Sequence, residues 1–300
     1  MIYTVTLNPA LDYIMKLEKL YFDDINRTNG EEISYGGKGI NVSAVLSRLG
    51  ISSIALGFQA GFTGDWLSQL LEKDDIQADL IKLRNGSTRI NVKLRAEAEL
   101  DINARGPEVQ EDEIEAFLEK TDKMKSGDIL VLAGSVPENL PDDIYERILS
   151  KTADKDVYSV VDAQGSLLLN TLKYKPFLIK PNHLELEELF GVKMSGEEEI
   201  IRYAKRLREM GALNVLVSRG GDGAVLVDES GCVHSIGVIR GRLVNSACCG
   251  DAMVAGFIAG YMKTKDYSYA LKLGAACANA TAFCYGLADK NSIMELFEKL

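Results

Sequence analysis

The segment Gly250-Asp251 lies where a run of small residues leads into a predicted helix, and its residue types suit phosphoryl chemistry. A helix N-terminus presents backbone N–H groups without intrahelical partners and a partial positive charge, so it binds anions. The N–H groups of Cys249, Gly250 and Asp251 can therefore hold a transferring phosphoryl group, and the Asp251 carboxylate can accept a proton from an attacking hydroxyl. The alternative is that Asp251 only caps the helix, a role that Asp often has.

A second chemical signal is the segment Gly36–Val42 (GGKGINV), which precedes another predicted helix. Its glycines let the backbone approach a ligand closely, and Lys38 adds a positive charge. The segment is not a P-loop, because Gly39 follows Lys38 in place of Ser or Thr and residue 32 is not Gly. Nor is there a dinucleotide fingerprint, since no Gly-x-Gly follows the first strand. A tight structural turn would explain the glycines equally well, but not the lysine.

Three further polar segments follow predicted strands, at the sheet edge where doubly wound proteins bind ligands. Asp12 follows the first strand, although a single Asp there is also a common turn former. In Lys180–Glu185 (KPNHLE), Asn182 and Glu185 can orient water around Mg²⁺, or Asn182 can serve only as a helix cap. The segment Ser218–Gly223 (SRGGDG) can wrap a nucleotide or form only a hairpin turn.

Strands and helices that would hold these segments alternate along most of the chain. Several predicted strands are continuous apolar runs, as expected in a parallel sheet buried on both faces. This order predicts an α/β fold with a doubly wound, mostly parallel sheet flanked by helices. The predicted strands are 2–7, 53–57, 129–132, 157–161, 177–180, 215–218 and 224–227. The predicted helices are 40–49, 65–72, 111–123, 142–151, 197–210, 252–262, 267–282 and 292–300.

Residues 12–35 and 88–104 break this rhythm, because both have the pattern of short alternating strands with polar turns. Two such segments form a small accessory sheet if they lie side by side. No Pro-rich or Ser-rich linker and no internal repeat divides the chain. We therefore predict a single domain over residues 1–300, with a small β-sheet lid built from about 12–35 and 88–104.

The composition limits the kinds of partner and location. Lys and Arg number 34 against 44 Asp and Glu, giving a formal net charge of −10. This balance argues against nucleic acid or an anionic membrane as the main partner. The N-terminal segment lacks a signal-peptide pattern, and no apolar stretch approaches the ~18 residues of a membrane span. Five scattered cysteines without Cys-x-x-Cys argue against a zinc site and fit reduced thiols. A cytoplasmic location is expected.

In chain order, five segments resemble the motifs of ribokinase-like (PfkB) sugar kinases: Asn8–Asp12, Gly36–Val42, Lys180–Glu185, Ser218–Gly223 and Gly250–Asp251. The resemblance covers essentially the whole chain and extends to 88–93 (TRINVK), 102–107 (INARGP) and 134–137 (GSVP). It implies a ribokinase-like fold and phosphoryl transfer from ATP and Mg²⁺ to a sugar phosphate. The implied acceptor is fructose 1-phosphate, which would give fructose 1,6-bisphosphate. The alternatives are tagatose 6-phosphate, fructose 6-phosphate, or a sugar-phosphate-binding regulator without turnover.

The resemblance also implies roles for individual residues. Asp251 is the implied catalytic base, and Gly250 and Cys249 contribute backbone donors of the anion hole. The implied sugar contacts are Asp12, Gly37, Asn41 and Ser135, and the implied phosphate contacts are Arg27, Lys38, Arg89 and Asn103. The implied ATP contacts are Lys180, Asn182, Ser218, Gly220, Gly223, Gly250 and Asn279, with Glu185 near the metal through water. Arg27, Lys38 and Arg89 are expected to converge as a phosphate clamp, and the lid is implied to form a homodimer.

One segment departs from the family pattern, which is usually Gly-Ala-Gly-Asp where this chain has Cys248-Cys249-Gly250-Asp251. A positive φ at residue 248 would cost a cysteine roughly 1–2 kcal/mol, whereas the backbone donors of the anion hole would be retained. Because a helix dipole lowers the pKa of a thiol at the helix N-terminus, we expect an alkylating agent to react with these thiols and inactivate the protein, and ATP to protect it. Burial of the thiols is the alternative and would oppose this reactivity.

Overall fold

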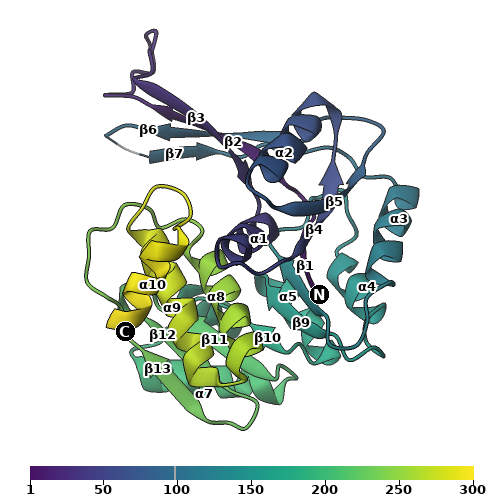
Figure 1. Ribbon diagram of the computed structural model, residues 1–300, viewed down its shortest axis with the longest axis vertical. Helices are drawn as coiled ribbons and strands as arrows, with labels where there is room; N and C mark the ends of the chain where they lie inside the picture. The colour runs from purple at the N-terminus through teal and green to yellow at the C-terminus, as the bar shows by residue number, and fades with distance from the viewer. Residues whose placement is uncertain (98) are drawn as a thin grey trace.

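The computed structural model describes residues 1–97 and 99–300, which form two β-sheets and the helices around them (Figure 1). Within these residues the main sheet has nine strands in the order β13-β12-β11-β10-β9-β8-β1-β4-β5. All neighbours pair in parallel except at β11-β12 and β12-β13. The strands are β1 (Ile2–Thr6), β4 (Ile54–Gln59), β5 (Gln77–Lys82), β8 (Ile129–Ala133), β9 (Tyr158–Asp162), β10 (Leu178–Ile179), β11 (Asn214–Ser218), β12 (Ala224–Val227) and β13 (Val233–Ile236).

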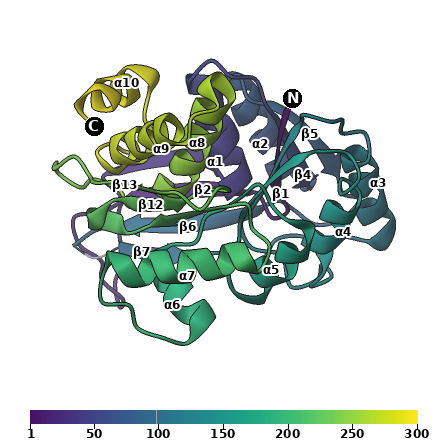
Figure 2. The same ribbon diagram turned by 90° about the horizontal axis from the view of Figure 1, so that it is seen from below.

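Helices cover both faces of this sheet, which confirms the predicted doubly wound α/β fold (Figure 2). One face is covered by α1 (Lys38–Arg48), α8 (Cys249–Thr264), α9 (Tyr267–Ala282) and α10 (Lys290–Lys299). The other is covered by α3 (Glu111–Thr121), α4 (Ile144–Ser150), α5 (Gly165–Thr171), α6 (His183–Phe190) and α7 (Glu197–Glu209). No helix among the described residues is long and apolar enough to cross a membrane.

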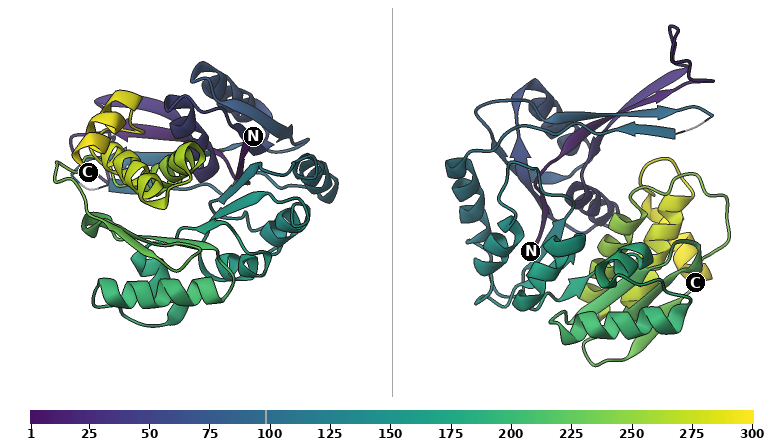
Figure 3. Two further views of the ribbon diagram at one scale, coloured as in Figure 1. Left: turned by 60° about the horizontal axis from the view of Figure 1, so that its bottom comes forward. Right: turned by 180° about the vertical axis from the view of Figure 1, so that it is seen from behind.

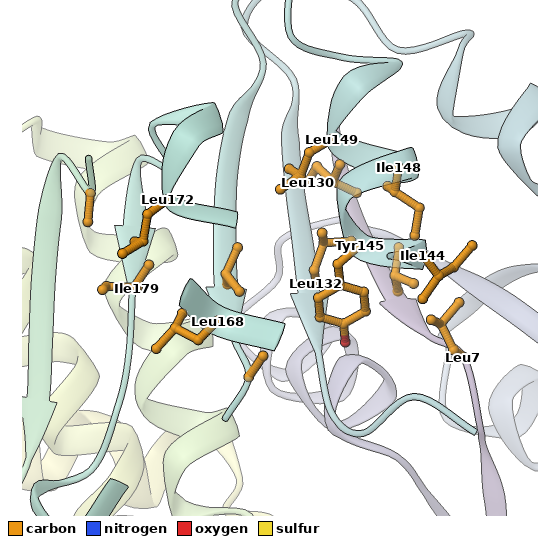
Figure 4. Packing of buried hydrophobic residues seen from close by; sticks show 14 of the residues in the cluster. Leu7, Leu130, Leu132, Ile144, Tyr145, Ile148, Leu149, Leu168, Leu172 and Ile179 are labelled. Atoms are coloured by element: carbon orange, nitrogen blue, oxygen red, sulfur yellow. The ribbon is translucent and has the colours of Figure 1, made fainter. Parts of the chain in front are cut away.

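The strand β8 shows why the central strands are apolar throughout. Leu130 and Leu132 point toward one face, where Figure 4 shows them near Tyr145 and Ile148 of α4. Val131, between them in sequence, belongs to the core on the opposite face. Successive side chains of a strand alternate between faces, so a strand covered on both sides must be apolar at every position.

The sequence patterns did not predict β5, β13, α5 or α6. The first two are the outermost strands of the main sheet, and every residue in them is exposed or half-buried. Such edge strands lack the continuous apolar run that identified the central strands. The helices α5 and α6 have seven and eight residues, and α4, which was predicted over 142–151, is equally short with seven.

The second sheet is the predicted lid, with strand order β3-β2-β6-β7. It consists of β2 (Ala10–Lys16), β3 (Gly30–Gly36), β6 (Arg89–Arg95) and β7 (Glu99–Ile102). These strands extend away from the main sheet (Figures 1 and 3). A small cluster that includes Leu11, Ile40 and Leu67 packs the lid base against α1 and α2 (Gly61–Lys73). The lid is therefore attached firmly at its base, next to the end of β1.

The strand order reverses beside β1, which has β4 on one side and β8 on the other. Ligands of doubly wound sheets bind at such a switch point, outside the carboxyl ends of the strands. A cleft with a volume of about 1600 Å³ lies there, and residues from the lid, α1, α8 and five strand ends line it. Its position makes this cleft the candidate functional site.

Candidate active site

The cleft brings together most of the residues singled out from the sequence. Its lining includes residues that are far apart in the chain, because β1, β8, β9, β10 and β11 all end at the same edge of the sheet. The predicted residues that line it are Asp12, Gly37, Lys38, Asn41, Arg89, Ser135, Lys180, Asn182, Glu185, Ser218, Gly220, Gly223, Cys249, Gly250, Asp251 and Asn279.

Two predicted phosphate contacts, Arg27 and Asn103, lie outside the cleft lining. Arg27 is exposed on the loop between β2 and β3, and Asn103 is exposed just after β7. Arg27 lies in the loop at the far end of the lid, so its side chain does not reach the switch point. Asn103 follows β7 where that strand returns toward the lid base, next to Ala104, whose carbonyl accepts from Arg89, but Asn103 itself does not line the cleft. The expected convergence of Arg27, Lys38 and Arg89 is therefore not formed within one chain, where only the last two line the cleft.

The glycines of the turn before α1 allow this helix to pack closely against β1. Gly37 has a φ of 125°, and a Cβ there would lie 2.5 Å from Thr6 Cγ2. A Cβ on Gly39 would collide with the backbone carbonyl of Val5. The tight-turn explanation is thus correct for these glycines, while Lys38 within the turn faces the cleft. Close backbone packing is what places this lysine beside the strand ends.

A buried carboxylate that no sequence motif predicted lies between two lysines of the cleft. Asp162, at the end of β9, has its Oδ2 3.3 Å from Lys38 Nζ and its Oδ1 3.4 Å from Lys180 Nζ. The Asp162 side chain is 2% exposed and that of Lys180 is 5% exposed. Burial alone would raise the pKa of Asp162, but Lys180 and Lys38 hold it below its usual value. Its position directly after an apolar strand was the available sequence signal.

Asp251 lies at the third position of α8 and is buried. Asn41 Nδ2 donates to its Oδ2 at 2.8 Å. Burial raises the pKa of Asp251 to about 7, and the nearby charge of Asp162 adds to this, whereas Asn41 and the two lysines oppose it. A carboxylate with a pKa near 7 is well matched to proton transfer at neutral pH.

The first turn of α8 leaves its backbone donors free. Its N-cap is Cys248, which has no side-chain capping bond, and the first intrahelical donor is Ala252, whose N–H reaches the Cys248 carbonyl at 2.9 Å. The N–H groups of Cys249, Gly250 and Asp251 precede that bond and have no intrahelical partner. Asp251 is therefore not the cap, and the donors of an anion hole are available beside it.

Cys248 adopts the left-handed conformation, with φ 62° and ψ −3°, so the condition for the backbone strain considered at this position is met. The expectation that the helix dipole lowers the pKa of the neighbouring thiols is wrong. Burial raises the pKa of Cys248 to about 12 and that of Cys249 to about 11, and in both cases Asp251 contributes. Desolvation thus outweighs the helix dipole, and both groups are neutral thiols at physiological pH.

On the lid side of the cleft, Asp12 is held in one orientation. Asn91 Nδ2 donates to its Oδ1 at 2.8 Å, and Lys93 Nζ lies 2.6 Å from its Oδ2. Arg89 is oriented by the backbone, since its guanidinium donates to the carbonyls of Asn8 and Ala104 at 3.1 and 3.2 Å. These are fixed polar groups of both signs, which suit the hydroxyls and phosphate of a sugar phosphate.

On the opposite side, Asn182 and Glu185 form a capping box at the start of α6. Asn182 Oδ1 accepts from the Glu185 N–H at 2.9 Å, and Glu185 Oε2 accepts from the Asn182 N–H at 2.7 Å. The Gln164 amide donates to Glu185 Oε1 at 2.5 Å. The capping role considered for Asn182 is thus correct, and it fixes the orientation of a carboxylate that lines the cleft.

The segment from Ser218 to Gly223 forms the hairpin turn between β11 and β12, so the hairpin alternative is also correct. A Cβ on Gly223 would collide with the carbonyl of Ile236. Asn279 of α9 accepts from the Ile239 N–H at 3.1 Å and thereby ties this helix to the loop after β13. All these segments line the same end of the cleft, together with the apolar residues Ile239 and Phe283.

Comparison with known proteins points to one family. Residues 5–294 match the pfkB family carbohydrate kinase pattern. The 1-phosphofructokinase of Bacillus subtilis is 42% identical over 300 residues, which is 100% of this chain and 98% of that protein. The D-tagatose-1-phosphate kinase of Bacillus licheniformis is 36% identical and covers 98% of this chain and 96% of that protein. The crystal structure of Escherichia coli phosphofructokinase-2 with substrates and products has a TM-score of 0.94, 25% identity, and coverage of 100% and 99%.

Proposed function

The chain belongs to the pfkB family of carbohydrate kinases, and from this premise we propose that it phosphorylates fructose 1-phosphate to fructose 1,6-bisphosphate with ATP. The observation that carries the proposal is that the buried Asp251 carboxylate lies in the first turn of α8, beside backbone N–H groups that have no intrahelical partner. It lines the same cleft as Asp12 and Arg89. A base and an anion hole side by side are what transfer of a phosphoryl group to a hydroxyl requires.

In the proposed reaction the C6 hydroxyl of the acceptor attacks the γ-phosphorus of ATP, and ADP leaves. The hydroxyl proton passes to the Asp251 carboxylate, which Asn41 orients. The N–H groups of Cys249, Gly250 and Asp251 bind the oxygens of the transferring group. Because these donors are backbone groups, replacing the family's usual residues by two cysteines leaves them in place.

The ion-pair chain formed by Lys38, Asp162 and Lys180 supplies positive charge near Asp251. We propose that the two ammonium groups offset the charge of the phosphates while Asp162 holds them in position. Burial alone would lower the pKa of Lys38, but Asp162 and Asp251 raise it, so this lysine stays charged. A local excess of cations is needed here because the whole protein has a net charge of −10.

We propose that Asp12 and Asn91 bind sugar hydroxyls, with Gly37 and Ser135, and that Arg89 binds the phosphate already present on the acceptor. Arg89 is suited to this because its planar fork can hold two phosphate oxygens. The nucleotide would then lie over Lys180, Asn182, Ser218, Gly220, Gly223 and Asn279.

A magnesium ion fits the residues beside the nucleotide end. Each Glu185 oxygen accepts one hydrogen bond within the protein and so retains capacity for a metal-bound water. Mg²⁺ keeps several waters and takes few protein ligands, so Glu185 and Asn182 would hold it through water. When bound, the ion would neutralise charge on the phosphates of ATP.

The relative from Bacillus licheniformis makes D-tagatose 1-phosphate a second candidate acceptor. A coupled ADP-release assay would compare fructose 1-phosphate, tagatose 1-phosphate, tagatose 6-phosphate, fructose 6-phosphate and free fructose. We expect the highest kcat/KM with fructose 1-phosphate. Free fructose should be at least ~10²-fold poorer, because the two charge-assisted hydrogen bonds that Arg89 can make to the phosphate, of about 1.5–3 kcal/mol each, are lost. Equal turnover of free fructose would refute the assignment, and binding without turnover of any sugar phosphate would indicate a regulator.

We also propose that the lid joins two copies of the chain in a homodimer. The lid has exposed apolar side chains at Ile90, Leu100 and Ile102. Light scattering during gel filtration would give the mass in solution, and Ile102→Lys should lower it to that of one chain. A monomeric wild-type protein would refute this part of the proposal.

A further inference from the structure

Cys248 has a strained backbone conformation inside the cleft. Among the described residues, the non-glycine residues with positive φ are Asp75, Asp156, Lys175, Cys248 and Lys265, and Cys248 alone of these lines the cleft. A side chain in the left-handed region persists only where its surroundings hold it there, and such strain is concentrated at functional sites. Glycine would adopt this conformation without strain, so the cysteine at residue 248 costs stability that its side chain would have to offset by a function.

The Cys248 side chain does not cap α8. It is the N-cap and Asp251 is the third helical residue, which is the spacing of a capping box, yet no side-chain capping bond forms. The sulfur lies instead 3.3 Å from Asn41 Nδ2, the same nitrogen that donates to Asp251 Oδ2 at 2.8 Å. An amide nitrogen has two hydrogens, so the sulfur and the carboxylate can each accept one.

We propose that Cys248 is a positioning residue for phosphoryl transfer: its sulfur keeps the Asn41 amide turned toward Asp251, and its side chain shields that carboxylate from water. The inference rests on the proposed function and deepens it. The sulfur is well placed for the shielding role, because it lines the cleft and shares the Asn41 amide nitrogen with Asp251, whose carboxylate is buried.

The chemical state of the thiol suits this position. Burial raises the pKa of Cys248 to about 12, so the group is neutral and adds no negative charge beside Asp251. The groups that face Asp251 are Asn41, Asp162, Lys38 and Lys180, in addition to the thiol. Because burial is the largest cause of the raised pKa of Asp251, letting water in at residue 248 should lower that pKa.

The test compares Cys248→Gly, which removes the sulfur and the strain, with Cys248→Ser, which keeps a hydrogen-bond acceptor. For Cys248→Gly we expect kcat/KM for fructose 1-phosphate to fall about tenfold, mainly through kcat, which corresponds to about 1.4 kcal/mol. The acid limb of its kcat profile should move to lower pH, while its melting temperature rises. Cys248→Ser should retain kcat/KM within about twofold.

Lys175→Gly is the matched control, because Lys175 has a φ of 51° and lies exposed at the end of a short 3-10 helix. It should gain thermal stability with unchanged kinetics. If Cys248→Gly behaves in the same way, with wild-type kcat/KM and pH profile, the strain has no role in positioning and the inference is overturned. If the glycine variant does not fold, Cys248→Ala tests the loss of the sulfur alone.

A readout independent of turnover separates this inference from the proposed function. Carbon-13 NMR of labelled aspartate would follow the Asp251 carboxyl group, with Asp251→Asn providing its assignment. The pH midpoint of the Asp251 titration should be lower in Cys248→Gly than in the wild type, and this measurement needs no substrate. A wild-type protein inactive on all ketose phosphates would refute the proposed function, whereas an unchanged midpoint would refute the shielding role of Cys248.

Discussion

Replacing Asp251 by Asn removes the proposed base and at the same time removes a buried charge. Asn has nearly the same shape and can still accept the hydrogen bond from Asn41, so the site should stay assembled. Without a proton acceptor, kcat should fall by roughly 10²-fold or more, the range expected for general-base catalysis. The coupled ADP-release assay with fructose 1-phosphate measures this loss.

The same substitution should stabilise the protein in a pH-dependent way. The pKa of Asp251 is about 7 in the folded protein, against an ordinary value of 3.8. Between these pH values the folded state holds a proton that the unfolded chain has lost, so the stability contributed by this group falls as the pH rises. At about 1.36 kcal/mol per pH unit, the full cost above pH 7 is at most about 4 kcal/mol.

Asp251→Asn should therefore melt several degrees higher than the wild type at pH 8 and at nearly the same temperature at pH 4. Asp154→Asn, which removes an exposed carboxylate far from the cleft, should change neither melting temperature nor kcat. A folded Asp251→Asn variant with kcat within tenfold of the wild type would refute its role as base. Equal stability of the two proteins at pH 8 would refute the buried-charge argument.

Two further substitutions and one labelling experiment test the surrounding groups. Arg89→Ala should lower kcat/KM for the sugar phosphate at least tenfold in steady-state assays, with KM for ATP unchanged, because its guanidinium lies at the lid end of the cleft. Gly39→Ala should lower the free energy of unfolding by about 1–3 kcal/mol in urea titrations, since its Cβ meets a backbone carbonyl of β1. In the native protein, iodoacetamide should label exposed Cys232 well before Cys248 and Cys249, as mass spectrometry would detect.

Several structural features could be predicted from local patterns because local physics determines them. Continuous apolar runs identified the central strands, since a strand covered on both faces is apolar at every position. The glycines before α1 and the small residues before α8 identified the two helix starts that line the cleft. The outer strands β5 and β13 were missed because exposure on one or more sides removes that pattern.

The sequence by itself determined the fold class, the lid segments and 16 of the residues that line the cleft, partly because strand ends and helix starts are encoded locally and partly through the resemblance to the PfkB family. Only the tertiary structure decided which of these side chains interact. It placed Asp162 between Lys38 and Lys180, left Arg27 outside the cleft, and half-buried Cys248 and Cys249 so that their thiol pKa values rise. Pairings and pKa values of this kind depend on burial and on charges from distant segments, and no local pattern contains that information.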